Sequence, residues 1–427
     1  MSNKNHKPTL SNPVAKPAKL NRPSAANIIF LLLTAVLIVL ITQTGAVQQH
    51  NPPANTSENE KADASPYTQD QLNFYQDTIT QLLLEHRFNG TVLLAKQGTV
   101  LFSRSFGFAN FRDHTPLTPE TPFQLASISK TFTAAAILLL QQKGKLHIDD
   151  KVIQHIPRFP YPEVSIRHLL NHTSGIQNYM WLVERYWDKN TRPTNEDVLD
   201  LFLHHPRHLD FWPGTRFAYS NTGYAFLALV IERVTDMPYA CFIQENIFDP
   251  LGMENSFVYD PNNPAYVADD RAYGFRRWGR HRLLIPDVDH DGVMGDKGIY
   301  SNIHDLYTWD RAIEEEKLLP DTIWNKAFAH TRLQNNRTVR YGMGWRLKTY
   351  MGSKVVHHPG RWNGFRTTLK RFAEQDATLI ILNNTSRNIV YLAERLQNIL
   401  FREERETFHA RKEQEDDTET EPVSGGG

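Results

Sequence analysis

The order of the predicted elements along the chain indicates an α+β fold, in which helices flank an antiparallel sheet and a mostly helical lobe adjoins it. A helical period over residues 68–87 is followed by two β-rich runs that meet at Gln97 and Gly98, a hairpin signal. A long, mostly helical block comes next. Strand-like runs return within residues 341–383, before a last helical period at 388–401. Strands and helices segregated in this way are typical of antiparallel sheets.

The composition provides enough apolar material for a sizeable core, since 40% of the 427 residues are hydrophobic and 11% are aromatic. The 47 basic and 47 acidic side chains cancel, so the whole-chain charge gives no indication of nucleic-acid binding. Cys241 is the only cysteine in the sequence, which excludes an intramolecular disulfide and a metal site built from cysteines.

The sequence contains no complete metal-binding pattern of the zinc or calcium types. The histidines form no His-Glu-x-x-His pattern, so zinc is not indicated. Residues 287–292 resemble the start of a calcium-binding loop, but Gly298 stands where such a loop needs a glutamate. We therefore expect no metal and no cofactor, and we expect this segment to be a loop that leads to the glycines at 295 and 298.

The N-terminal region is predicted to anchor the chain in a membrane. Residues 1–24 are polar and contain lysine and arginine but no acidic residue, and residues 25–42 are apolar apart from Asn27 and Thr34. This apolar run is close to the minimum length for crossing a bilayer. Basic flanks stay in the cytoplasm, so we expect a single-pass protein of the cell membrane with an extracytoplasmic domain. A cleaved signal peptide is the alternative, since residues 44–46 are an acceptable cleavage site.

The remaining chain divides into three parts by composition. Residues 43–67 are rich in Asn, Gln, Pro and charged side chains, which predicts a flexible linker. Residues 68–402 carry the periodic patterns and are predicted to form the folded domain. Residues 403–427 are densely charged and end in glycines, which predicts a disordered tail.

Ser127 and Lys130 form a Ser-x-x-Lys arrangement at the start of a strongly apolar helical stretch, Phe123–Leu140. Residues three apart on a helix lie on one face, so these two side chains can share a proton. A serine hydroxyl is a poor nucleophile until a neighbour takes its proton. The pair alone is a weak signal, because it recurs by chance and a serine here can simply be a helix cap.

Two further boxes follow in order, Tyr219-Ser220-Asn221 and His358-Pro359-Gly360. With these boxes the chain resembles the serine β-lactamase and penicillin-binding-protein superfamily, in particular the class C β-lactamase-like hydrolases and esterases. The resemblance covers about residues 70–400, and it implies a β-lactamase/transpeptidase-like fold. The connecting phrases that also fit the family are residues 144–150, 166–175, 213–224 and 250–253.

The resemblance implies a serine hydrolase that forms an acyl-enzyme at Ser127. Lys130 would share or polarise the proton of Ser127, and Tyr219 would act first as general base and then as general acid. Asn221 would hydrogen-bond Lys130 and the acyl amide of the substrate. A tyrosine serves as a base at neutral pH only where cations stabilise its phenolate, and Lys130 and a protonated His358 are expected to supply that charge.

The third box also suggests how the substrate is held. The backbone N–H groups of Ser127 and Arg361 are expected to form the oxyanion hole. Pro359 departs from the family pattern, because it has neither a hydroxyl for a substrate carboxylate nor an N–H for a sheet, and we expect it on an edge strand. Gly360 and Arg366 are candidate substrate-binding residues, since Arg366 or Arg361 could replace the lost carboxylate contact.

These features predict an esterase, amidase or peptidase that acts on a small-molecule or peptide acyl substrate of the cell envelope. A β-lactamase or D-alanyl-D-alanine carboxypeptidase is the alternative within the family. A relative without activity that binds cell-wall peptide is the alternative of another class. The sequence leaves the leaving group and the oligomeric state open.

Overall fold

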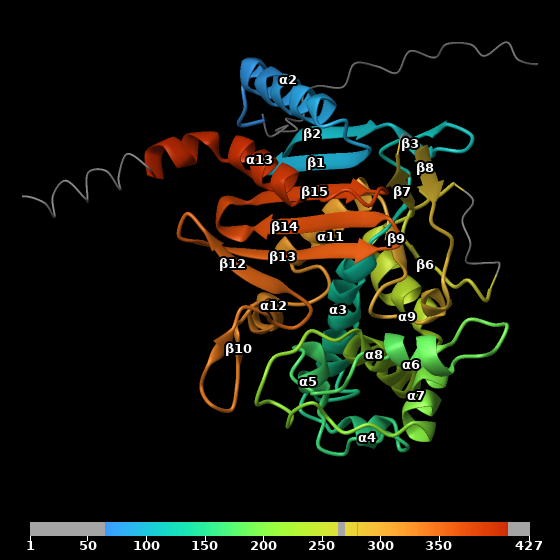
Figure 1. Ribbon diagram of the computed structural model, residues 1–427. Coiled ribbons are helices and arrows are strands. Elements are labelled where there is room, and N and C mark those ends of the chain that lie inside the picture. The colour runs from blue at the N-terminus through green and yellow to red at the C-terminus, as the bar shows by residue number, and fades with distance from the viewer. Residues whose placement is uncertain (1–64, 264–269, 280, 409–427) are drawn as a thin grey trace, which may run out of the picture. The chain divides into compact units, whose positions relative to one another are not determined.

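The computed structural model describes residues 65–263, 270–279 and 281–408 (Figure 1). The predicted cytoplasmic segment, the predicted membrane helix and nearly all of the predicted linker lie outside these residues, as does the tail from residue 409 onward. No helix within the described ranges is long and apolar enough to cross a membrane. Residues 402–408 are helical, in contrast to the disorder predicted from residue 403, and the Arg402–Glu406 pair, one helical turn apart, supports this helix.

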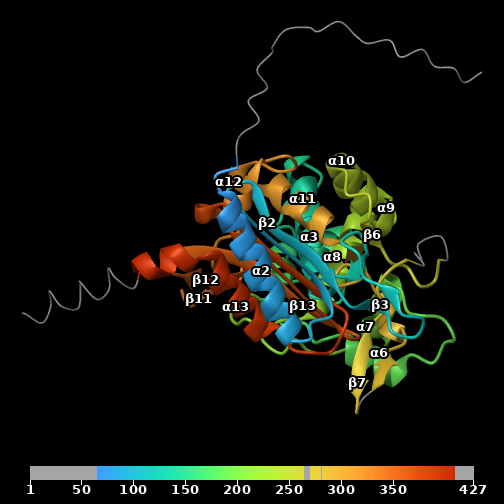
Figure 2. The same cartoon turned by 90° about the horizontal axis from the view of Figure 1, so that it is seen from above.

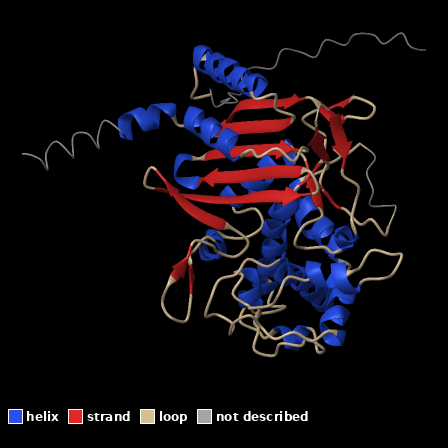
Figure 3. Cartoon of the chain, viewed as in Figure 1, coloured by secondary structure: helices blue, strands red, loops and turns tan. Residues whose placement is uncertain are grey.

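A six-stranded antiparallel sheet in the order β12-β13-β14-β15-β1-β2 is the centre of the fold (Figures 1 and 3). The predicted hairpin at Gln97 and Gly98 is confirmed, and both residues have the positive φ that such a turn requires. Because β1 pairs with β15, the two ends of the described chain meet in one sheet. The strands are β1 (Gly90–Lys96), β2 (Thr99–Phe106), β12 (Arg346–Tyr350), β13 (Ser353–Trp362), β14 (Phe365–Phe372) and β15 (Ala377–Asn383).

The strands β1 and β15 are apolar on both faces at their centres, because their apolar residues follow one another without interruption. In β1, Val92 and Leu94 belong to one buried cluster, whereas Leu93 belongs to another. The partner strand follows the same alternation, since Ile381 lies opposite Val92 and Ile380 lies opposite Leu93. Side chains of a strand alternate between its faces, so each face needs a covering layer of its own.

Helices supply both covering layers. Figure 2 shows α2 (Gln69–Glu85) and α13 (Val390–Leu400) on one side of the sheet and α3 (Ser129–Gln142) and α11 (Ile303–Glu314) on the other. Thr68 caps α2 through its hydroxyl, which accepts the backbone N–H of Gln71 in a capping box. We call the face covered by α2 and α13 the outer face, and the opposite one the inner face.

The helical block predicted after residue 140 lies on the inner side, below the sheet in Figure 3. It contains α4 (Val152–His155), α5 (Ile166–Leu170), α6 (Met180–Tyr186), α7 (Asn195–His204), α8 (Asn221–Thr235), α9 (Tyr239–Ile243) and α10 (Asp249–Leu251). The helix α12 (Asp321–Ala327) follows α11. Short ribbons complete the described fold: β3 (Phe108–Asn110) with β4 (Thr115–Pro116), β5 (Phe123–Gln124) and β6 (Phe257–Val258) on either side of β9 (Ile299–Ser301), β7 (Phe275–Trp278) with β8 (His281–Leu284), and β10 (Thr331–Arg332) with β11 (Thr338–Val339).

Helix α3 is the central element between the sheet and the helical block. Its residues from Ser129 to Leu140 are all buried, which explains why it is apolar on every side rather than on one stripe. Two threonines in this helix hydrogen-bond carbonyl groups, Thr131 to Ile128 and Thr133 to Gly295. The second bond ties α3 to the glycine-containing loop at 295–298.

The position of Pro359 differs from the expected edge strand. β13 lies between β12 and β14 and is therefore an interior strand. Its pairing with β12 ends at His357, however, so residues 358–362 pair with β14 alone. Proline has no N–H to donate to a second neighbouring strand. Pro359 needs no such donor, because β12 no longer pairs with β13 at this position.

Candidate active site

Ser127 lies in a short 3₁₀ turn, η1 (Ala126–Ile128), that leads directly into α3. The turn begins with a strained residue, since Ala126 has a φ of 53° in the left-handed region. Lys130 lies in the first turn of α3, and its Nζ is 3.3 Å from Ser127 Oγ. The structure therefore brings the two residues of the first box together, with the serine in the 3₁₀ turn that precedes α3.

Lys130 is fully buried and is held by three acceptors. Besides Ser127 Oγ, its Nζ donates to Asn221 Oδ1 at 2.9 Å and to the Asp296 carbonyl at 2.7 Å. An ammonium group has three N–H donors, and these three oxygens match them. A buried charge is tolerated only when it is hydrogen-bonded in this way. The arrangement favours a charged Lys130 that polarises the serine hydroxyl.

Tyr219 and Asn221 come from the segment that starts α8. Asn221 is the first residue of this helix, and Tyr219 precedes its N-cap, Ser220. Lys130 Nζ lies 5.2 Å from the centroid of the Tyr219 ring, and the guanidinium carbon of Arg346 lies 5.1 Å from it. Arg346 begins β12 and was not predicted as a site residue, because nothing in the sequence indicates that the edge strand passes Tyr219.

A chain of hydrogen bonds behind Tyr219 links the second and third boxes. The Ser220 backbone N–H donates to His172 Nδ1 at 3.3 Å, so the His172 proton is on Nε2, which donates to the Tyr341 hydroxyl at 3.0 Å. The Tyr341 hydroxyl donates to His358 Nε2 at 3.3 Å, and His358 Nδ1–H donates to the Pro359 carbonyl at 2.8 Å. Every donor in this chain meets an acceptor when both histidines are neutral.

The protonated His358 expected from the sequence is not supported. Burial, with the nearby positive charges of Lys130 and Arg346, lowers the pKa of both His172 and His358 well below the usual value. His358 is only 1% exposed, and both its nitrogens are used inside the protein. Its imidazole is therefore neutral at neutral pH and holds its surroundings in place, and Arg346 takes the place of the second cation beside Tyr219.

The third box brings its strand into direct contact with the serine turn. A Cβ on Gly360 would lie 2.2 Å from the Leu125 carbonyl oxygen, so only glycine permits this approach. The Thr367 hydroxyl donates to the same carbonyl at 2.8 Å and fixes the turn to β14. Ser127 and Arg361 line one small cavity as a result, which is the placement that an oxyanion hole made of their N–H groups needs.

That small cavity contains a second lysine that the sequence did not single out. Besides Ser127, Asn221 and Arg361 it is lined by Asp296 and Lys297, and it measures about 20 Å³. The other residues that line it are Ala126, Met180 and Trp362.

Lys297 is 2% exposed and belongs to a buried polar network. Its Nζ donates to the Tyr179 hydroxyl at 2.7 Å and to Asp296 Oδ1 at 3.3 Å. Burial lowers its pKa, while the Asp296 and Asp291 carboxylates oppose that effect. Asp291, from the segment that resembled a calcium loop, accepts from Trp362 Nε1 at 2.5 Å. The network therefore fixes Trp362 beside the serine.

Arg366 is not brought to the serine. It lies opposite Arg361 in the β13–β14 ladder and lines a larger cavity on the outer face, as Pro359 does. Gly360 lies at the contact between β13 and η1, so its closeness to Ser127 comes from its backbone. A carboxylate contact by the Arg366 side chain in the serine site, as expected from the sequence, has no support in this geometry.

Comparison with known proteins adds a family and several relatives. The family model described as beta-lactamase matches residues 75–403. Penicillin-binding protein 4* of Bacillus subtilis (strain 168) is 38% identical over 331 residues, which cover 74% of this chain and 73% of that protein. A D-aminopeptidase of Gluconobacter oxydans (strain 621H) is 26% identical over 69% of this chain, but only 55% of its own length is matched.

Solved structures share the same architecture. The octameric penicillin-binding protein homologue from Pyrococcus abyssi has a TM-score of 0.64 and 26% sequence identity, over 77% of each chain. The predicted fold, an antiparallel sheet flanked by helices with a mostly helical lobe, is confirmed for the described part of the chain.

Proposed function

Because the chain belongs to the beta-lactamase family of serine hydrolases, we propose that it cleaves an amide or peptide bond of a cell-envelope compound through an acyl-enzyme at Ser127. The observation that carries this proposal is the position of Lys130, whose Nζ reaches Ser127 Oγ and Asn221 Oδ1 at once. A hydroxyl held in this way is oriented and polarised for attack on an acyl carbon.

Tyr219 is the proposed base. Lys130 and Arg346 lie within about 5 Å of its ring centroid, so two cations surround the side chain that would take the proton. Tyr219 would take the proton of Ser127 during attack and deliver it to the leaving amine. His172 and Tyr341 are positioning residues in this scheme, since they hold the backbone and the ring behind Tyr219.

The developing oxyanion would be bound by the backbone N–H groups of Ser127 and Arg361. Gly360 makes this pair possible, because it lets η1 and β13 touch. Asn221 Nδ2 remains available to the substrate's acyl amide apart from a contact of 3.6 Å with Met180 Sδ. Removal of one oxyanion donor costs about 10²–10³ in rate in other hydrolases, so this contact would be the largest single term.

The names of the relatives support an amide or peptide substrate. One is a penicillin-binding protein and another is a D-aminopeptidase, and both kinds of name refer to ligands with an acyl group next to nitrogen. The anchor predicted for residues 25–42 would place the domain outside the cytoplasm, where envelope peptides occur. We propose both assignments together, because an envelope substrate requires an extracytoplasmic domain.

A substrate panel tests the proposal. Purified protein is offered D-amino-acid amides and short D-peptides beside p-nitrophenyl esters and nitrocefin, and the released products are quantified. We expect release from amides or peptides that Ser127→Ala abolishes and Ser129→Ala retains. Ser129 is the matched control, since it is the second serine of the same box and accepts a backbone N–H from Ile299. Turnover that persists in Ser127→Ala would contradict the proposal.

A further inference from the structure

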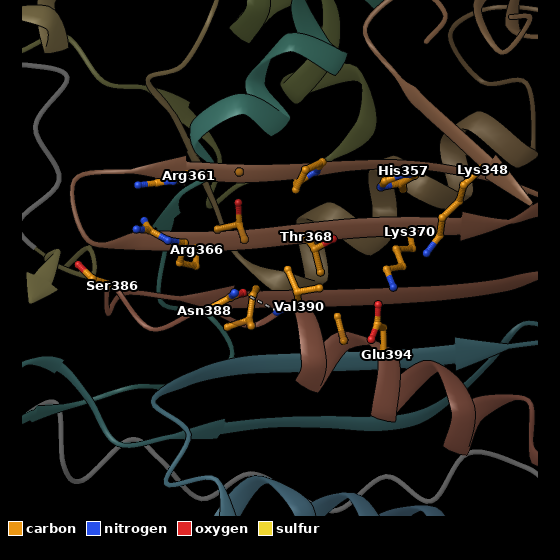
Figure 4. Close-up of a pocket in the computed structure, with 15 residues that line it drawn as sticks. Lys348, His357, Arg361, Arg366, Thr368, Lys370, Ser386, Asn388, Val390 and Glu394 are labelled. Atoms are coloured by element: carbon orange, nitrogen blue, oxygen red, sulfur yellow. Dashed lines mark hydrogen bonds between the residues drawn. The ribbon is translucent and has the colours of Figure 1, made fainter. Parts of the chain in front are cut away.

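A second cavity lies on the outer face of the sheet, opposite the serine site. It measures about 580 Å³, which is within the range of small-molecule binding sites. Strands β13 and β14 form its floor, and the start of α13 forms one wall (Figure 4). The proposed function makes no use of this cavity.

The floor of the cavity is built from facing residues of the two strands. His357 lies opposite Lys370, and Arg361 lies opposite Arg366. Directly opposed residues of antiparallel strands point to the same face, so all four side chains belong to the outer face. Lys348 of β12 completes the cationic set, and Figure 4 shows its side chain and that of Lys370 approaching each other.

Four cationic side chains and a single carboxylate, that of Glu394, line the cavity. Within the described part of the chain, none of Lys348, Lys370, Arg361 and Arg366 forms an ion pair, although ion pairs satisfy the neighbouring Arg371. Lys370 is 5% exposed, and its Nζ donates to Gln397 Oε1 at 2.9 Å. Burial and the charge of Lys348 lower the pKa of Lys370 to about 7. Like charges placed opposite each other are unfavourable, and a bound anion would relieve that repulsion.

The cations stand at two ends with an uncharged surface between them. Arg366 and Lys370 are four residues apart on β14, a separation of about 13 Å along a strand. Pro359 and Thr368 face each other between these ends, and Ala393 of α13 covers the middle. Figure 4 shows the same arrangement, with the arginines at one end and the lysines at the other.

We propose that this cavity binds an organic dianion, with one acidic group at Lys348 and Lys370, the other at Arg361 and Arg366, and an apolar body against Pro359 and α13. A carboxylate matches the fork of an arginine and neutralises a pair of lysines. Glu394 on α13 is the one carboxylate that lines the cavity, and it opposes an anion there.

The site shares only Arg361 with the groups of the proposed catalysis, through its side chain rather than its backbone N–H, and it is tested without that catalysis. The full-length chain carrying Ser127→Ala is titrated with decanedioate by calorimetry. Decanoate and decane-1,10-diol serve as probes with one acidic group and with none. We expect saturable binding of decanedioate at one site per chain, weaker binding of decanoate and no measurable binding of the diol.

Charge removal identifies the site. Lys370→Met and Arg366→Met are each expected to weaken decanedioate binding about tenfold or more, the usual effect of losing a charged hydrogen bond. Lys354→Met removes a charge from the exposed start of β13 and is expected to leave the affinity within twofold. Glu394→Gln is expected to strengthen binding. Circular dichroism and thermal unfolding confirm the fold of each variant, and Lys348→Met replaces Lys370→Met if the latter does not fold.

Three results would overturn the proposal. Decanedioate that does not bind would remove the site, and equal affinity for the diol would make the cavity an apolar pocket without charge recognition. Affinity unchanged in Lys370→Met, Lys348→Met and Arg366→Met would place the bound molecule elsewhere on the surface. Failure of the serine chemistry would leave all of these measurements intact, because the test protein lacks Ser127.

Discussion

The contact between Gly360 and the serine turn supports a quantitative prediction. In Gly360→Ala, the new Cβ would lie 2.2 Å from the Leu125 carbonyl oxygen and 2.0 Å from Thr367 Oγ1. The threonine side chain can rotate, but the carbonyl belongs to the backbone that leads into Ser127. Real Cβ contacts are essentially never under 3.0 Å, so η1 and β13 must separate by at least 0.8 Å.

This separation acts on both proposed oxyanion donors, because one is on η1 and the other is on β13. A displacement near 1 Å at a reacting group typically costs about 10²-fold in rate. Overpacking of a tight contact also costs about 1–3 kcal/mol of stability. We therefore expect Gly360→Ala to fold, to unfold at a lower temperature and to react about 10²-fold more slowly at Ser127.

The assay is the second-order rate of labelling by a fluorophosphonate, followed by intact mass, beside thermal unfolding. Gly90→Ala is the matched control, since its Cβ would lie 2.1 Å from the Leu382 carbonyl oxygen, a contact between β1 and β15 that does not involve η1. The control is expected to lose stability while it keeps its labelling rate. Labelling of Gly360→Ala at the wild-type rate, or an equal loss in Gly90→Ala, would refute the proposed role of this contact.

Three further predictions concern protons. Tyr219→Phe should lower kcat or the labelling rate about 10²–10⁴-fold with little change in KM, because a general base is lost, and an unchanged rate would exclude it. In the unfolded chain Lys370 keeps its proton up to about pH 10, whereas its pKa in the folded protein is about 7. The free energy of unfolding should therefore rise between pH 8 and pH 10, by up to about 1.4 kcal/mol per pH unit. Denaturant titrations of Lys370→Met should show a shallower rise, and identical slopes would contradict the lowered pKa. His172 and His358 are neutral in the folded protein and take up protons only on unfolding, so the free energy of unfolding should fall as the pH drops below about 6.5. This fall should be less steep in His358→Asn than in the wild type. Equal slopes of the free energy of unfolding against pH would contradict a neutral His358.

The sequence predicted the parts of the site that are specified by short segments. Ser127 and Lys130 are three residues apart, and Tyr219 and Asn221 are two apart, so local geometry holds each pair. The order of strand and helix signals likewise predicted the sheet and the lobe. Only the resemblance to a family indicated that the two segments meet, because no physical rule relates residues 90 positions apart.

The sequence did not predict the residues whose role depends on how distant segments of the chain pack together. Arg346 reaches Tyr219 because β12 begins beside that residue, and Lys297 enters the serine cavity because its loop packs against α3. His358 was expected to be charged, but charge depends on burial, which a three-residue box does not reveal. The outer cavity left a visible signal, since Arg366 and Lys370 are four residues apart in β14 and therefore point to the same face of the strand.

The most direct test of the central claim is the site of acylation. The wild-type chain is incubated with a D-amino-acid ester, quenched in acid and analysed by intact mass and peptide mapping. We expect one acyl group on Ser127, absent from Ser127→Ala and accumulated in Tyr219→Phe if deacylation is slowed more than acylation. An acyl group on another residue, or none under conditions where product forms, would contradict an acyl-enzyme at Ser127.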